Sequence, residues 1–224
     1  GWRASLAGGI LITSLMGVIA TRSDLSTLGA YAAFISAIGV WGWIEFTFLT
    51  GLVTGPRTAP CPPDADGWRR FALAAQTLIY HEILILAALC AILAVTWGGA
   101  NPIAPMTFAA LALMRLSAKL NLFLGAPNFT DDLMPTRLRY LRSYFSPARA
   151  SLLLPAGVLA MAASAGVLAA EGMSTGQPDA RQTGFLLLAG LIGLGALEHV
   201  FMVLPVRDSV LWRWAKPKAA VQER

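Results

Sequence analysis

The sequence predicts an all-α protein, a polytopic bundle of about six transmembrane helices with an amphipathic helix on the cytoplasmic surface. Of its 224 residues, 56% are hydrophobic and 13% are charged, and the mean hydropathy of +0.63 is typical of a membrane protein. The hydrophobic residues form runs long enough to cross a bilayer. The net charge of +5 comes from basic residues beside these runs, which indicates membrane topology and argues against nucleic-acid binding.

Six hydrophobic segments form the expected bundle, a single transmembrane domain over residues 1–224. The expected spans are roughly 5–20, 28–51, 71–97, 103–124, 151–170 and 184–204. The first ends at polar residues 21–24, and the second is followed by a proline-rich loop. Glycine, asparagine and proline at 98–102 predict a tight turn before the fourth span, and a polar loop at 171–183 separates the last two spans.

Basic residues in the loops assign the two sides of the membrane. Thirteen lysines and arginines flank the spans on one side, whereas only Arg22 and Arg181 lie on the other. Cytoplasmic loops carry the excess of positive charge. We therefore expect the loops 52–70 and 125–150 and the C-terminus to lie in the cytoplasm, with the lipid bilayer as a partner of the whole chain.

Residues 135–146 are expected to form an amphipathic helix at the cytoplasmic membrane surface. Proline can begin a helix at position 135, and hydrophobic residues then recur at helical spacing with arginines between them. The tail has a similar aromatic segment at 210–214. The expected surface residues are Arg137, Leu138, Arg139, Leu141, Arg142, Phe145, Trp212 and Trp214. They would anchor the protein among lipid headgroups or, alternatively, dock a protein partner.

Eight polar or charged side chains fall within the expected spans, in their cytoplasmic half. They are Glu45, His81, Glu82, Arg115, Lys119, Asn121, Glu198 and His199. A charge at the bilayer centre costs about 3 kcal/mol on insertion scales. Arg115 and Lys119, which share one helix face, should therefore face protein, a polar cavity or the headgroups. Three carboxylates nearly balance the two cations, so we expect one buried cluster that neutralises itself.

Three interpretations of this cluster remain open from the residues alone. It can be an ion-pair and hydrogen-bond network that ties the helices together. It can hold a ligand, since a neutral histidine in a membrane can bind the magnesium of bacteriochlorophyll or another tetrapyrrole, and His81 or His199 would do so. It can be the metal site of an enzyme, although the Glu-x-x-His spacing of di-metal bundles is absent. The metal ligands would then be Glu45, His81, Glu82, Glu198 and His199.

Short motifs along most of the chain resemble the PuhE family, photosynthetic complex assembly proteins of purple phototrophic bacteria. The motifs lie at 41–45, 48–51, 54–57, 80–82, 115–121, 124–128, 139–145, 197–199, 204–205 and 211–212. The resemblance implies a non-catalytic accessory or assembly subunit in the bacterial inner, intracytoplasmic photosynthetic membrane. Such a subunit would support bacteriochlorophyll supply or assembly of the reaction centre and its light-harvesting ring. Its partners would be reaction-centre, light-harvesting or pigment-biosynthesis proteins. The alternative is a membrane metalloenzyme of bacteriochlorophyll biosynthesis.

Two departures from the family pattern have consequences. Histidine is common in the family at the position of Ile44, so a metal or pigment role for this position is weakened here. The family also has a further span, with a Trp-rich beginning, ahead of the first span of this chain. The full-length protein would then have seven spans and a periplasmic N-terminus.

Overall fold

The computed structural model describes residues 2–127, 134–146, 150–174 and 179–204, and within them every regular element is a helix. The α-helices are α1 (Trp2–Thr21), α2 (Thr27–Leu49), α3 (Gly67–Gln76), α4 (Ile79–Thr96), α5 (Ile103–Leu124), α6 (Leu153–Gly172) and α7 (Ala180–Phe201). Five of these, α2 and α4 to α7, are long and apolar enough to cross a membrane, and α1 adds the shorter apolar segment Ser5–Thr21. The expected all-α membrane bundle is confirmed. Trp212 and Trp214 lie outside the described residues.

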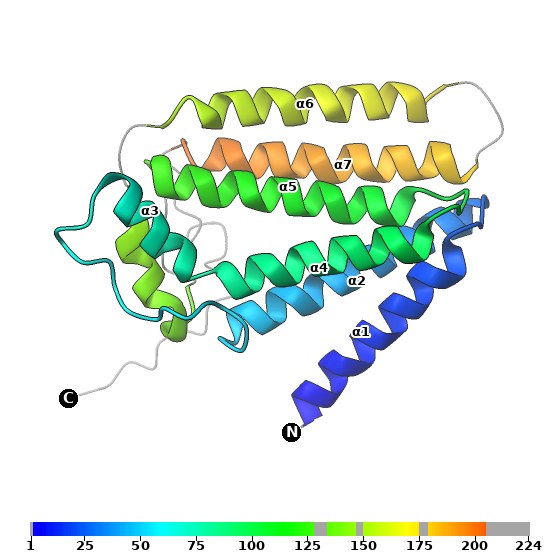
Figure 1. Ribbon diagram of the computed structural model, residues 1–224. Helices are drawn as coiled ribbons and strands as arrows, with labels where there is room; N and C mark the ends of the chain where they lie inside the picture. Colours follow the sequence, from blue (N-terminus) through cyan, green and yellow to red (C-terminus); the bar gives the residue numbers. More distant parts are fainter. Residues whose placement is uncertain (1, 128–133, 147–149, 175–178, 205–224) are drawn as a thin grey trace, which may run out of the picture.

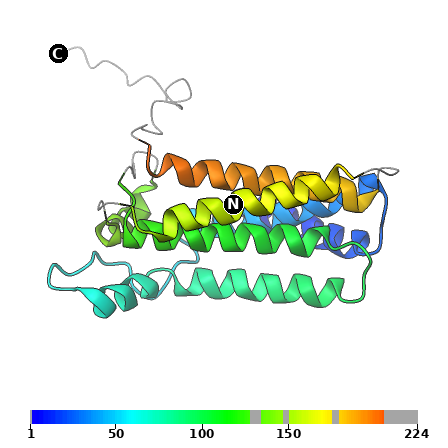
Figure 2. The same cartoon turned by 90° about the horizontal axis from the view of Figure 1, so that it is seen from above.

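The long helices lie side by side along a common direction, and successive ones run in opposite senses (Figure 1). The view from above also shows that the axes of α4, α5, α6 and α7 are aligned (Figure 2). α1 packs on α2 and diverges from the bundle toward its N-terminus (Figure 1). Small residues allow this close packing, since a Cβ on Gly17 or Gly39 would collide with a serine of the facing helix. Among the helices, α2 contributes the most residues to the central core, namely Ala30, Ala33, Ala37, Val40 and Ile44.

The expected third span, 71–97, is wrong as one continuous helix, because the structure divides it into α3 and α4. The loop after α2 enters the break, where the backbone N–H of His81 donates to the carbonyl of Thr54 at 3.0 Å. The loop fits there because residue 55 is glycine. A Cβ on Gly55 would collide with the backbone carbonyl of Gln76. α3 consequently turns across the end of the bundle and only α4 remains a span (Figure 1).

The amphipathic α-helix expected at 135–146 is instead a 3₁₀ helix, η1 (Thr136–Tyr144). Its buried side chains are Leu138, Leu141 and Tyr144. This spacing of three residues matches the three residues per turn of a 3₁₀ helix, so all three lie on one face. The sequence pattern was correctly amphipathic, but its period belongs to the tighter helix.

The apolar face of η1 packs on protein. Leu138 and Leu141 form a small core with Phe48 of α2, and the Nε of Arg57 donates to the Tyr144 hydroxyl at 2.6 Å. The expectation that these leucines face lipid is therefore corrected. Of the other expected surface residues, Arg137, Arg139 and Arg142 are exposed and Phe145 is half-buried. We call the end of the bundle covered by α3 and η1 the η1 end.

Candidate functional site

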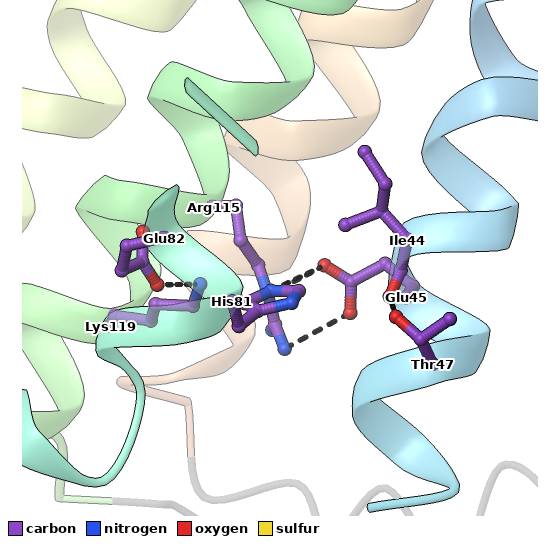
Figure 3. A network of polar contacts seen from close by, with 7 residues as sticks. All are labelled: Ile44, Glu45, Thr47, His81, Glu82, Arg115 and Lys119. Carbon is purple, nitrogen blue, oxygen red and sulfur yellow. Dashed lines mark hydrogen bonds and ion pairs between the residues drawn. The ribbon is translucent and has the colours of Figure 1, made fainter. Parts of the chain in front are cut away.

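A half-buried ionic cluster lies near the η1 end, where α2, α4 and α5 meet (Figure 3). Its centre is Glu45 of α2. Arg115 of α5 donates from Nη2 to Glu45 Oε2 at 3.3 Å and places Nε 3.3 Å from Oε1. His81 of α4 places Nε2 3.6 Å from the same Oε1. One carboxylate thus faces a guanidinium and an imidazole that come from two other helices.

A second ion pair lies one helical turn further along α5, where Lys119 donates to Glu82 of α4 (Figure 3). The neighbours His81 and Glu82 diverge by about 100° around their helix, so one is directed to Glu45 and the other to Lys119. The side chain of Lys119 is 13% exposed and that of Glu82 is 32% exposed. The two carboxylates and two cations cancel each other's charge, which makes their position inside a membrane helix bundle tolerable.

Asn121 and His199 belong to a separate, uncharged network on the opposite side of α5. The His199 Nδ1 lies 2.8 Å from the Gly195 carbonyl, and its Nε2 lies 3.1 Å from the Ser117 hydroxyl. Because a carbonyl only accepts, Nδ1 carries the hydrogen and Nε2 of the neutral ring accepts from Ser117. The Asn121 Nδ2 donates to the Ser117 carbonyl, and its Oδ1 accepts from the hydroxyl of Ser151.

Ser117 and Ser151 are the polar residues of this region that sequence reasoning missed. Ser117 could have been found, since it lies four residues before Asn121 and therefore on the same face of an otherwise apolar helix. Ser151 gives no such signal, because it meets Asn121 only through the fold. Both ring nitrogens of His199 are occupied in this network, so a ligand on His199 would first have to displace the Ser117 hydroxyl.

The five side chains considered as metal ligands do not converge. Among the described residues, no group of three or more His, Cys, Asp or Glu side chains is arranged to hold a metal ion. His81 and Glu45 approach one another, whereas Glu82 faces a lysine and His199 belongs to the uncharged network. Glu198 is exposed and lines, together with Glu45, a cavity of about 250 Å³ between α2, α5 and α7.

His81 is buried without a hydrogen-bond partner. Its side chain is 0% exposed, and neither ring nitrogen makes a hydrogen bond within the described residues. The ring of Phe48 lies against it, with 4.5 Å between the centroids. An unsatisfied buried polar group costs about 1–3 kcal/mol, and such a group in a native fold requires an explanation such as a bound molecule or a functional role. His81 is therefore the stronger ligand candidate of the two histidines.

A cavity of about 280 Å³ lies beside the ionic cluster, between α2 and α5 on one side and α3 and η1 on the other. We call it the η1 cavity. Its walls are mainly apolar and include Phe48, Phe123 and Leu138. Arg115 and Lys119 also line it. The arrangement places two cationic side chains at the surface of an apolar cavity inside a membrane protein.

The chain belongs to a protein family whose description is "Protein of unknown function (DUF3623)", and the family model matches residues 1–223. It is similar to a protein of Rhodobacter capsulatus named "Uncharacterized 30.4 kDa protein in puhA 5′region". The two are 40% identical over 215 residues, which cover 95% of this chain and 78% of the relative. No solved structure matches the chain with significance.

Proposed function

We propose that this DUF3623 protein is an accessory or assembly subunit for the bacterial photosynthetic reaction centre and its light-harvesting ring. The observation that carries the proposal is the place of the relative's gene, in the region 5′ of puhA, a photosynthetic reaction-centre gene. The resemblance to the PuhE family leads to the same process. In this role the chain supports bacteriochlorophyll supply or complex assembly, and its partners are reaction-centre, light-harvesting or pigment-biosynthesis proteins.

The outer face of α6 is the proposed contact surface for these partners. α6 packs mainly on α7, and only 11% of the residues in its most apolar 18-residue stretch are buried inside the protein. Ala156, Ala160 and Ala163 are exposed and share one face of the helix. Small residues allow two helices to approach closely in lipid. This face therefore suits a transmembrane helix of a partner protein.

We also propose an orientation for the chain in the bacterial inner, intracytoplasmic membrane. Exposed arginines gather at the η1 end, among them Arg69, Arg137 and Arg139. Since positive charge marks the cytoplasmic side, we assign the η1 end to the cytoplasm. The loops 52–70 and 125–150 and the C-terminus then lie on that side.

We assign no catalytic residue to the chain. If the subunit carries a tetrapyrrole, His81 is the candidate ligand, because neither of its ring nitrogens makes a hydrogen bond within the described residues. Binding would require Phe48 to move aside, since its ring lies against the imidazole. Glu45 would then hold the orientation of the histidine, as carboxylates do for metal-ligating imidazoles.

Gentle purification of the tagged protein from a phototrophic membrane tests the proposal. The preparation is analysed for absorption, for metals and for copurifying subunits. We expect reaction-centre or light-harvesting subunits together with bacteriochlorophyll or carotenoid bands. A colourless protein without these subunits that holds about two irons per chain, as di-iron bundles do, would overturn the proposal in favour of a metalloenzyme of pigment biosynthesis.

A pair of variants tests the proposed contact surface. Ala163→Phe enlarges the exposed face of α6, whereas Leu86→Phe enlarges the face of α4, where the leucine is 60% exposed. We expect the first variant to lose its partners at an unchanged protein level, and the second to retain them. Equal copurification of both variants would show that α6 is not the contact surface.

A further inference from the structure

We propose that the η1 cavity binds a hydrophobic carboxylic acid, with its carboxylate at Arg115 and Lys119 and its hydrocarbon body along the apolar walls. This inference does not depend on the proposed photosynthetic role. The cavity volume of about 280 Å³ lies near the lower limit of small-molecule sites, about 300–1,000 Å³.

Arg115 and Lys119 retain hydrogen-bond donors after their ion pairs are formed. A guanidinium has five N–H groups and an ammonium has three. Within the described residues, Arg115 pairs only with Glu45, through Nε and Nη2, and Lys119 pairs only with Glu82. The contact from Nε does not meet hydrogen-bond geometry. A ligand carboxylate in the cavity would accept charge-assisted hydrogen bonds from the remaining donors.

The charge on the cavity surface has one sign. Glu45 pairs with Arg115 and Glu82 pairs with Lys119. Neither carboxylate is among the residues that line the cavity. Among the described lining residues, the ionised ones are both cations. The ion pairs therefore hold the two cations in place, while the cavity itself presents only their positive ends. This surface favours an anion over a cation or a neutral ligand.

The walls indicate an apolar ligand body, since they are built mainly from hydrophobic side chains. Phe48 comes from α2, Phe123 from α5, and Leu138 and Leu141 from η1. Phe123 is fixed in its place by an edge-on contact with Phe71, at 5.5 Å between the centroids. A carboxylate is small enough to reach both cations within a cavity of about 280 Å³, whereas a phospholipid headgroup is much larger. We therefore commit to a free carboxylic acid.

Fluorescence titration of the purified chain in detergent micelles tests the proposal. The probes are cis-parinaric acid, a fluorescent polyene fatty acid, and its methyl ester, which has the same body without the charge. We expect the acid to saturate at one molecule per chain, and the ester to bind about 10- to 100-fold more weakly because it loses charge-assisted hydrogen bonds. Equal affinities for acid and ester would overturn the proposal.

Two variants locate the site. Met134→Trp narrows the cavity at a half-buried lining residue and should weaken both probes, whereas Leu86→Trp on the exposed face of α4 should change neither. The double variant Lys119→Met with Glu82→Gln removes a cation and its counter-charge together. It should weaken the acid by about tenfold and leave the ester unchanged.

The remaining outcomes also decide the matter. If Met134→Trp binds the acid as well as Leu86→Trp does, the probe occupies another place and the inference fails. If phosphatidylglycerol displaces the acid at an equal molar ratio, the site belongs to a lipid headgroup and the commitment to a free acid is wrong. If the double variant does not fold, the affinities of the unaltered chain for the acid and for the ester still test whether the charge of the ligand is recognised. No photosynthetic partner is present in this assay, so its result is independent of the copurification experiment.

Discussion

Replacing Arg115 by methionine should destabilise the bundle, because it leaves Glu45 without its cation. Removing one member of a buried ion pair costs about 3–5 kcal/mol. The side chains of Arg115 and Glu45 are 31% and 18% exposed, so solvent and headgroups screen part of the charge. We therefore expect a loss at the lower limit, about 3 kcal/mol. His81 can replace the arginine only when it is protonated, since a neutral imidazole carries no charge.

The measurement is a double-mutant cycle on the free energy of unfolding. Arg115→Met, Glu45→Gln and the double variant are unfolded reversibly in mixed micelles of a nonionic detergent and dodecyl sulfate. We expect the double variant to lose less than the sum of the two single variants, by about 1–3 kcal/mol. This difference is the coupling between the two side chains and not the cost of either change alone.

The second ion pair supplies a matched control. Lys119→Met should be rescued by Glu82→Gln and not by Glu45→Gln, because Glu82 is the partner of Lys119. The reasoning is refuted if Arg115→Met and Glu45→Gln are strictly additive. It is equally refuted if Glu82→Gln rescues Arg115→Met as well as Glu45→Gln does, since the four charges would then act as a diffuse field rather than as two pairs.

Four smaller changes test other parts of the structure in the same assay. Gly55→Ala should be destabilising because its Cβ would collide with a carbonyl at the break between α3 and α4, whereas Gly166→Ala, with open space around it, should stabilise α6 by about 0.5–1 kcal/mol. Ser117→Ala should cost about 1 kcal/mol, because the His199 Nε2 loses its hydrogen-bond partner, and no loss would contradict this hydrogen bond. Hydrogen bonds from the serine two residues later lower the pKa of Asp24 below its ordinary 3.8. The ionised Asp24 carboxylate therefore stabilises the fold at neutral pH, and this stabilisation is lost as the pH falls through the lowered pKa. The free energy of unfolding of the variant Asp24→Asn should lack this pH dependence.

Most of the helices could be predicted from the sequence because a bilayer leaves a polypeptide few alternatives. The run at 103–124 coincides with α5, and the run at 28–51 differs from α2 by at most two residues. The run at 71–97 failed for a physical reason. Hydropathy depends only on the residues of the segment itself. The break, in contrast, depends on the loop after α2, because the N–H of His81 donates to the carbonyl of Thr54 and not to a carbonyl of the preceding helical turn.

The polar residues of the site were visible in the sequence, but their partners were not. The spacing of α5 separates Arg115 and Lys119 from Ser117 and Asn121, which follows from 3.6 residues per turn. Which carboxylate meets which cation depends on the rotation of α2 and α4 about their axes, and no local pattern reports that rotation. One expected cluster is therefore two networks, one ionic and one uncharged, on opposite sides of α5.

The two networks differ in what explains them. The uncharged network around His199 is satisfied by its own members and needs nothing beyond the stability of α5 against α6 and α7. Buried ion pairs, in contrast, are weak devices for stability, since apolar residues of similar size often serve as well or better. A bundle that needed only to hold together could have apolar residues at all four positions, Glu45, Glu82, Arg115 and Lys119. The two cations instead line an apolar cavity while their counter-charges lie behind them, an arrangement that binding of an anion explains and packing alone does not.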